Sequence, residues 1–146
     1  MHKALNYMSL ARKAGLIELG EEPVGAAARA GHARLIVVAR DASDHTWRRA
    51  KSFAAGTNQQ CVRLVFSKDE MGLAIGRTSL AIAAFTDPAM ALAFVKALDD
   101  QDRYREVLEA LDVKSKKLRQ RQTEAKAHQR NVRTGKHRHA PEPKKD

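Results

Sequence analysis

The sequence contains a single cysteine, Cys61, and no long hydrophobic run. One cysteine excludes an internal disulfide and any zinc site built from several cysteines. No apolar run approaches the roughly 18 residues that a membrane-spanning helix needs. Residues 1–5 lack the apolar stretch and cleavage pattern of a signal peptide. We therefore expect a soluble, cytoplasmic protein.

Residue combinations typical of enzymes are also missing. The glycines of segment 72–76 have the wrong spacing for a dinucleotide-binding loop, and the sequence has no phosphate-binding loop of the Walker type. Asp41 and His45 have the spacing of an acid–base pair, but we favour a helix-capping aspartate and an exposed helix histidine. Three of the six histidines fall in the basic C-terminal segment, which has no cysteine and few carboxylates. We expect no catalytic activity, no metal site and no cofactor.

What the sequence has in excess is positive charge. Its 146 residues include 27 Lys and Arg against 17 Asp and Glu, a net charge of +10. This excess favours a polyanionic partner, either nucleic acid or an anionic membrane surface. Segment 114–140 alone has a net charge of +9, with ten basic residues and one acidic residue, Glu124. Its lack of apolar residues argues against membrane insertion, and its cation density favours phosphate contact over a merely solubilising role.

Hydrophobic patterning divides the chain into three parts. Residues 1–98 alternate between helical patterns and apolar runs in the order α-β-α-β-α-β-α-β-α, which predicts a largely parallel sheet between helical layers. Residues 99–112 have the spacing of a short amphipathic helix. Residues 113–146 have too little apolar surface to offset the entropy of folding, which predicts a disordered tail. The fold class is therefore α/β, a three-layer α-β-α sandwich with a four-stranded central sheet.

Local signals place several of these elements. The runs 35–39 and 80–85 are continuously apolar, as is typical of strands buried on both faces of a sheet. Ser67 and Glu70 have the spacing of a capping box, which predicts a helix that begins after Ser67. Asp87 followed by Pro88 predicts another helix start, with Asp87 as the cap.

Several segments in series carry a family resemblance. They are 10–15 (LARKAG), 20–22 (GEE), 35–43 (LIVVARDAS), 66–68 (FSK) and 72–77 (GLAIGR). In order and spacing these segments resemble the ribosomal kink-turn-binding family, whose archaeal member is the L-seven-Ae protein of the large subunit. Within that family the chain is most similar to the small bacterial YlxQ-type RNA-binding proteins. The resemblance covers about residues 3–98.

The resemblance implies an α-β-α sandwich that binds kinked RNA containing tandem G·A pairs. Relatives contact RNA with the loop entering the second helix, the start of the third helix and the loop before the last strand. With the cation Lys13 added, the candidate RNA-binding residues are Lys13, Gly20, Glu21, Glu22, Ser43, Trp47, Lys68, Arg77, Thr78 and Ser79. Trp47 stands where relatives place an apolar side chain against an extruded base. Both a stacking indole and a partly buried packing residue fit this position.

The chain departs from the family pattern at one loop. Relatives with well-characterised RNA binding carry Asn, Glu and, further along, Lys after the glycine, whereas this chain has Glu22, Pro23 and Ala26 there. The Glu22 carboxylate can accept a hydrogen bond from a guanine edge, but it also repels phosphate. Pro23 has no backbone N–H to donate, and Ala26 offers no polar group. The resemblance therefore implies RNA binding with altered contacts at this loop.

We expect a monomeric protein that binds structured, kink-turn-like RNA, ribosomal or ribosome-associated, with ribosomal or assembly proteins as further partners. Two alternatives remain open. The same fold can serve as a protein-interaction adaptor with only non-specific RNA binding. It can also serve as the substrate-binding partner of an RNA-modifying enzyme, because similar domains occur fused to methyltransferases.

Overall fold

A computed structural model describes residues 2–134 of the chain. The chain divides into two compact units, Met1–Asp112 and Val113–Asp146. The helices are α1 (Lys3–Ala14), α2 (Glu21–Arg29), α3 (Asp44–Ala54), α4 (Lys68–Ala74), α5 (Pro88–Ala97) and α6 (Arg105–Thr134). The strands are β1 (Ile17–Leu19), β2 (Leu35–Val38), β3 (Gln60–Arg63) and β4 (Ile82–Phe85).

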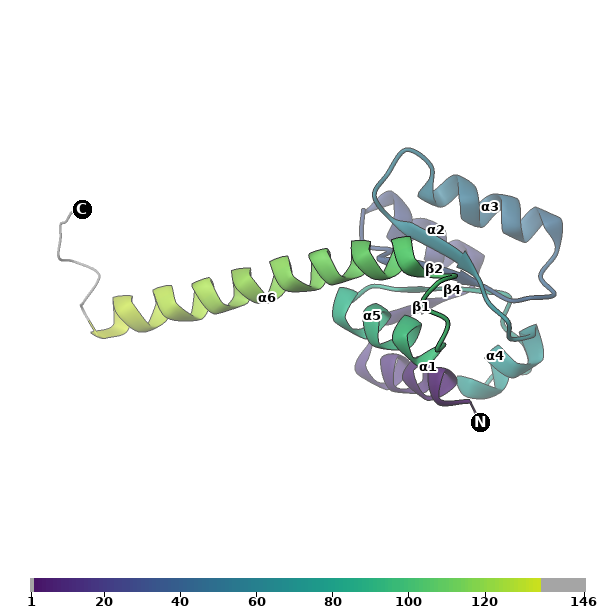
Figure 1. Cartoon of the computed structure of the whole chain (residues 1–146), viewed down its shortest axis with the longest axis horizontal. Coiled ribbons are helices and arrows are strands. Elements are labelled where there is room, and N and C mark those ends of the chain that lie inside the picture. Colours follow the sequence, from purple (N-terminus) through teal and green to yellow (C-terminus); the bar gives the residue numbers. More distant parts are fainter. Residues whose placement is uncertain (1, 135–146) are drawn as a thin grey trace. The chain divides into compact units, whose positions relative to one another are not determined.

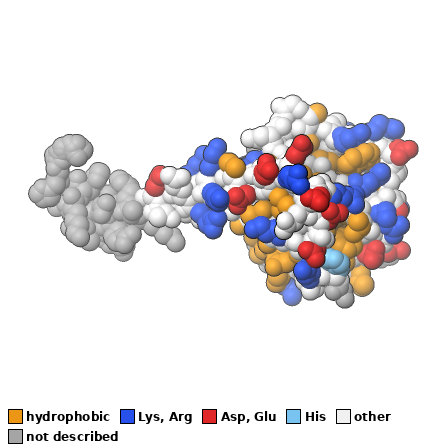
Figure 2. All heavy atoms as spheres, viewed as in Figure 1, with side chains coloured by type: hydrophobic (Ala, Val, Ile, Leu, Met, Phe, Trp, Pro, Cys, Tyr) orange, Lys and Arg blue, Asp and Glu red, His pale blue; other side chains and the backbone are white. Residues whose placement is uncertain are grey.

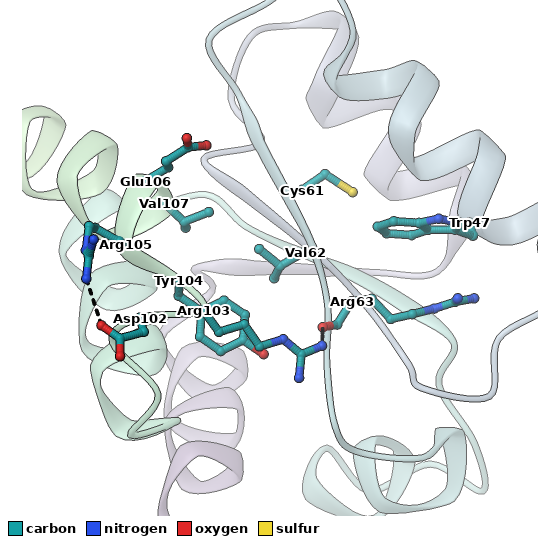
Figure 3. A pocket seen from close by; sticks show the side chains of 10 residues that line it. All are labelled: Trp47, Cys61, Val62, Arg63, Asp102, Arg103, Tyr104, Arg105, Glu106 and Val107. Carbon is teal, nitrogen blue, oxygen red and sulfur yellow. Dashed lines mark hydrogen bonds and ion pairs between the residues drawn. The ribbon is translucent and has the colours of Figure 1, made fainter.

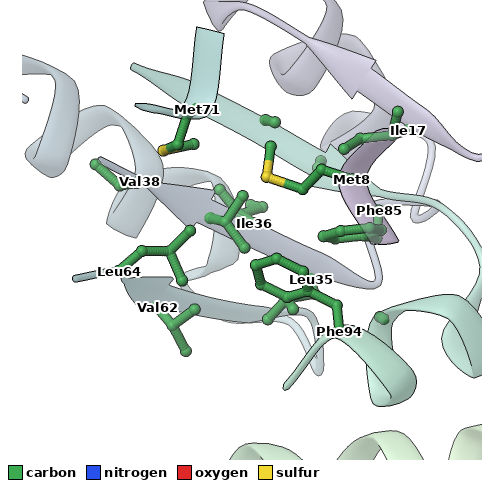
Figure 4. Close-up of a cluster of buried hydrophobic side chains, with 14 of the residues drawn as sticks. Met8, Ile17, Leu35, Ile36, Val38, Val62, Leu64, Met71, Phe85 and Phe94 are labelled. Atoms are coloured by element: carbon green, nitrogen blue, oxygen red, sulfur yellow. The ribbon is translucent and has the colours of Figure 1, made fainter. Parts of the chain in front are cut away.

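The first unit has the predicted three layers. Helices α2 and α3 cover one face of the four-stranded sheet, and α1 and α5 cover the other (Figure 1). The inner strands β2 and β4 are buried along their whole length, as the apolar runs of the sequence predict. The side chains of Met8, Leu35 and Phe94 belong to the resulting core (Figure 4). The ring of Phe94 in α5 packs against the ring of Phe85 in β4, with a distance of 4.8 Å between the ring centroids.

The direction of β4 corrects one prediction. The strand order is β1-β4-β2-β3, and β4 runs antiparallel to both of its neighbours, so the sheet is mixed rather than largely parallel. The reason lies in α4, whose seven residues span only about 10 Å. The N–H of Leu80, beyond α4, donates to the carbonyl of Lys68, where α4 begins (3.0 Å). The chain thus enters β4 from the edge at which β3 ended, which reverses the strand direction.

Two predicted helix starts are confirmed. The Ser67 hydroxyl accepts from the N–H of Glu70 (3.1 Å), and the Glu70 carboxylate accepts from the N–H of Ser67 (2.9 Å), which completes the capping box. The Asp87 carboxylate accepts from the N–H of Met90 (2.8 Å) at the start of α5, with Pro88 in the first turn. These bonds satisfy donors that a helix start leaves without a partner.

The C-terminal helix is longer than the sequence suggested. We expected a helix ending near residue 112 and a disordered tail, whereas α6 continues to Thr134. A shortage of apolar residues argues against packing, but it does not prevent helix formation. The segment is rich in Lys, Arg and Gln, which have high helix propensity. Gln120 and Glu124, four residues apart, share a 3.2 Å hydrogen bond. The rest of the predicted tail, 135–146, lies outside the described residues.

Within residues 2–134, no helix combines the length and the apolar character that crossing a membrane requires.

Candidate nucleic-acid interface

Four loops meet at one edge of the sheet, where β1, β2 and β3 end and β4 begins. In the sheet register, Val38 of β2 lies opposite both Ile82, the first residue of β4, and Arg63, the last residue of β3. We call the surface that these loops form the rim. It consists of residues 20–22, 40–43, 66–68 and 76–80. The rim therefore assembles segments that are up to about sixty residues apart in the sequence.

Hydrogen bonds join the loops of the rim to each other and to the sheet. Three backbone hydrogen bonds of 2.7–3.0 Å connect these segments. The N–H of Gly20 donates to the carbonyl of Ile82, the N–H of Arg40 to that of Phe66, and the N–H of Leu80 to that of Lys68. The Asp41 carboxylate also accepts a 2.8 Å hydrogen bond from the N–H of Lys68. This bond, followed by the nearby positive charges of Lys68 and Arg40, lowers the pKa of Asp41 below its ordinary value. Asp41 therefore cross-links two loops, and it is not half of an acid–base pair with His45. The prediction that Asp41 caps the helix containing His45 is also wrong, because Ser43 occupies that position.

The rim is mixed in charge. Helices α2, α3 and α4 all begin there, so their positive dipole ends face the same edge. Acidic side chains in the first turns of these helices balance the dipoles: Glu21, Glu22, Asp44, Asp69 and Glu70. Among the rim cations are Arg40, Lys68 and Arg77. Figure 2 likewise shows cationic and acidic side chains interspersed over the visible face. The rim is therefore a surface of individually placed charged groups rather than a uniformly basic patch.

The predicted loop before α2 lies at the rim. Gly20 adopts a positive φ of 96°, which favours glycine, and it precedes Glu21 and Glu22. Glu22 is exposed, whereas Glu21 is partly covered and forms a 3.6 Å ion pair with Arg49 of α3. An exposed pair of this kind contributes little to stability. Its consequence is local, because Arg49 partly neutralises one of the two carboxylates at the start of α2.

Ser43 and Trp47 lie in and just after the loop that leads into α3. The Ser43 hydroxyl accepts from the N–H of Thr46 (3.1 Å) and caps the helix. Trp47 is half-buried and packs against the core, which matches the packing interpretation of this residue. Part of its side chain nevertheless remains accessible to solvent. The guanidinium of Arg63 lies 5.0 Å from the Trp47 ring centroid and the amine of Lys51 lies 5.4 Å from it, so the indole borders a cationic surface.

The loop from Gly76 to Ser79 projects from the rim. Its Arg77, Thr78 and Ser79 are all exposed, and the N–H of Arg77 donates to the carbonyl of Gly72 (2.8 Å). Gly72 permits this turn, because a Cβ there would lie 2.6 Å from the Cα of Ser79. The packing of the loop on α4 fixes a cation and two hydroxyls at the surface, where they can contact phosphate and sugar.

Lys13 is the one predicted site residue that belongs to none of the loops and helix starts at the rim. It lies in the last turn of α1, from which the chain enters β1 at the opposite edge of the sheet. That edge is marked by Ile17, which pairs with Phe85 at the far end of β4. A cation at the end of a helix can be recognised from the sequence, but the edge of the sheet that this end reaches depends on the strand directions, so the sequence alone cannot separate Lys13 from the rim.

Sequence reasoning missed a groove beside Trp47. We call it the β3 groove; it has a volume of about 600 Å³ and is lined by Trp47, Cys61, Val62, Arg63 and residues 102–107 (Figure 3). Burial raises the pKa of Cys61 to about 11, which keeps the thiol protonated and argues against a nucleophilic role. The spacing of apolar residues over 99–112 predicts a helix that includes Tyr104, but nothing in the sequence indicates that this segment lies along β3. Among the described residues, no cluster of His, Cys, Asp or Glu is suited to hold a metal ion.

Comparisons with known proteins support the fold. The sequence matches no protein-family model and no curated protein. Among solved structures, it is similar to a Bacillus halodurans protein of unknown function, with a TM-score of 0.64 and 22% identity over 68% of this chain and 100% of that one. It is also similar to the Giardia lamblia 15.5kD RNA binding protein, with a TM-score of 0.55 and 18% identity over 73% of this chain and 85% of that one. At these identities the likeness concerns the fold.

Proposed function

We propose that this protein binds structured RNA through the rim. The observation that carries the proposal is the convergence of nine of the ten candidate residues at or beside one edge of the sheet. They come from separate loops and helix starts that hydrogen bonds hold together. The fold is also that of an RNA-binding protein from Giardia lamblia. The rim offers hydrogen-bonding groups with fixed positions, which suit a folded RNA better than an unstructured polyanion.

The RNA that we propose is kink-turn-like, and ribosomal or ribosome-associated. This step rests on the family resemblance of residues 3–98, which places the RNA contacts in the loops that form the rim. Segment 114–140, with its net charge of +9, supplies additional phosphate affinity that weakens as salt rises. In this proposal the rim determines which RNA is bound, and the basic segment increases the affinity of the complex. We further propose that the protein acts in the cytoplasm, has no catalytic activity and requires no cofactor.

The test is a fluorescence-anisotropy titration of the full chain with a labelled kink-turn RNA at about 150 mM salt. The comparison RNA has its tandem G·A pairs converted to Watson–Crick pairs. We expect a preference of at least about tenfold, or 1.4 kcal/mol, for the kink-turn RNA. Equal, weak binding of both RNAs would refute recognition at the rim and favour the adaptor function on the same fold.

Two matched variants locate the binding surface. Arg77→Ala removes a cation from the rim, and Lys13→Ala removes a cation from the opposite edge of the sheet. Both side chains are exposed, so neither change should disturb the core. We expect Arg77→Ala to weaken kink-turn binding by about tenfold and Lys13→Ala to change it by less than about twofold. Equal losses in the two variants would mean that only total charge matters.

A further inference from the structure

Strand β3 forms an edge of the sheet. Among the described strands it is the last in the order, and it pairs with β2 on one side. The N–H of Leu64, directly after β3, donates to the carbonyl of Val38 in β2 (2.8 Å). Since the backbone groups of a strand alternate in direction, the N–H and carbonyl of Val62 also face β2. The backbone groups of Cys61 and Arg63 therefore face away from the sheet.

This edge has little of the protection that edge strands usually carry. Native proteins guard such edges with lysine, proline, a bulge or a covering segment. Strand β3 contains neither Pro nor Lys, and its pairing with β2 continues over four residues without a bulge. The guanidinium of Arg103 donates to the carbonyl of Arg63 (3.3 Å) and covers one end of the edge. The β3 groove lies beside the rest of it, at Cys61 and Val62.

The β3 groove has walls on both sides of the strand. Residues 61–63 all line it, although successive side chains of a strand point to opposite faces of the sheet. Trp47 of α3 stands on one side of the strand, and Tyr104 and Val107 stand on the other (Figure 3). The groove has a volume of about 600 Å³. Its position suits an added strand whose side chains alternate between the two walls.

The charges around the groove favour an acidic partner. Its lining contains three arginines and two acidic residues: Arg63, Arg103, Arg105, Asp102 and Glu106. The Asp102 carboxylate already forms a 2.7 Å ion pair with the guanidinium of Arg105. This pair leaves two arginines against one carboxylate, so acidic side chains complement the lining better than basic ones.

We propose that the β3 groove binds an extended, acidic segment of a partner protein, which pairs with β3 as an additional strand. The backbone of Cys61 presents a donor and an acceptor side by side, and another polypeptide backbone offers the complementary pair in the same alternation. RNA phosphates only accept hydrogen bonds and leave the carbonyl without a partner. A second copy of this chain would bring the arginines of two grooves together, which charge repulsion disfavours. The inference is independent of RNA binding at the rim.

The probe is a hexapeptide of alternating glutamate and valine with blocked ends, titrated into the full chain. Trp47 is the only tryptophan of the sequence and lines the groove, so its emission reports on binding. We expect a saturable change in this emission. We also expect the NMR signals of the Cys61 and Arg63 amides to shift, because an added strand contacts the outer edge of β3. A hexapeptide with lysine in place of glutamate should bind at least about tenfold more weakly.

N-methylated peptides test the strand pairing without changing the protein. In an added strand, every second N–H faces β3 and the others face solvent. Methylating the valine nitrogens blocks one of these two sets, and methylating the glutamate nitrogens blocks the other. We expect one pattern to weaken binding at least about tenfold and the other to weaken it less than about twofold. Equal effects of the two patterns would overturn the proposed pairing.

Two variants at Cys61 provide the matched test on the protein. Cys61→Pro removes the outward N–H and leaves the hydrogen bonds to β2 in place, as proline does on natural edge strands. Cys61→Ala removes the thiol and keeps the N–H. We expect the proline variant to bind at least about tenfold more weakly, and the alanine variant to stay within about twofold of the wild type. Failure to bind the glutamate peptide, or a response to hexauridylate RNA and not to this peptide, would overturn the proposal.

Discussion

The carboxylate of Asp41 accepts a 2.8 Å hydrogen bond from the backbone N–H of Lys68, 27 residues further along the chain. The bond connects the loop after β2 to the start of α4. It satisfies one of the N–H groups that the first turn of α4 leaves without a helical partner. Since Lys68 and the loop that contains Asp41 both belong to the rim, the same bond fixes the spacing of two candidate RNA-binding loops.

Replacing Asp41 with alanine should therefore loosen the rim. We expect Asp41→Ala to lower the melting temperature by roughly 2–5 °C at pH 7 and to weaken kink-turn RNA binding several-fold. Circular dichroism and anisotropy measure the two effects. Asp41→Asn is the matched control, because an amide oxygen can still accept the hydrogen bond but carries no charge. A variant with Ala at position 41 that melts and binds like the wild type would show that the bond has no role in the rim.

The contribution of Asp41 to stability should depend on pH. Its pKa is lowered in the folded protein from an ordinary value of 3.8, because the Lys68 N–H stabilises the carboxylate. The stabilisation is therefore complete above pH 3.8 and is lost as the pH falls through the lower, folded pKa. The difference in melting temperature between wild type and Asp41→Ala should shrink below pH 3.8. An unchanged difference down to pH 2 would contradict an ionised Asp41 in the bond.

The close packing of Gly72 against Ser79 leads to a second prediction about stability. A Cβ at this position would lie 2.6 Å from the Cα and 2.7 Å from the N of Ser79, which are backbone atoms and cannot rotate away. Gly72→Ala should therefore destabilise the protein by about 2 kcal/mol, measured by urea unfolding, and should displace the loop that carries Arg77. Leu73→Ala serves as the control on the same helix. Leu73 is 72% exposed, and we expect less than about 0.5 kcal/mol from its removal.

Most of the fold followed from local signals in the sequence. Capping at Ser67 and Asp87 and the apolar runs of the inner strands reflect interactions between near neighbours, and the structure confirms them. The direction of β4 did not follow. It depends on whether α4 crosses the sheet or turns back, and that depends on the close packing of Gly72 against Ser79. This long-range fit leaves no periodic pattern in the sequence.

The sequence likewise predicts only part of the candidate site. The family resemblance identified three loops, and the structure brings them to one edge of the sheet. It could not show that Lys13 belongs to the other edge, because the residue type says nothing about strand direction. The β3 groove had no sequence signal at all. It arises because residues 102–107 lie beside Arg63, about forty positions earlier in the chain.

Removing residues 113–146 should separate charge-driven binding from recognition. The remaining residues form the first compact unit, Met1–Asp112, which contains the sheet and the rim. Because the deleted segment carries most of the excess positive charge, we expect a shallower slope of log K against log salt, with the preference for kink-turn RNA retained. Anisotropy titrations between about 50 and 200 mM salt measure both quantities. A slope equal to that of the full chain would show that the basic segment does not touch phosphate.

Introducing the kink-turn-binding pattern at the loop after Gly20 tests the proposed contribution of this loop to RNA recognition. The kink-turn-binding proteins that the sequence resembles carry Asn, Glu and Lys where this chain has Glu22, Pro23 and Ala26, and all three of these side chains are exposed on α2. The triple variant Glu22→Asn, Pro23→Glu, Ala26→Lys adds one net positive charge. It also restores a side-chain amide, a backbone N–H and a phosphate-binding amine. We expect it to raise the preference for kink-turn RNA over the Watson–Crick control by at least about tenfold, or 1.4 kcal/mol.

Ala30→Lys is the matched control for this variant. It adds the same net charge at the exposed C-terminal end of α2, away from the rim. Extra charge alone should strengthen binding to both RNAs equally, because counterion release does not depend on sequence. A gain in preference that appears in the triple variant and not in Ala30→Lys would assign guanine readout to this loop. Equal behaviour of the two variants would mean that the chain recognises its RNA through the α3 and α4 loops instead.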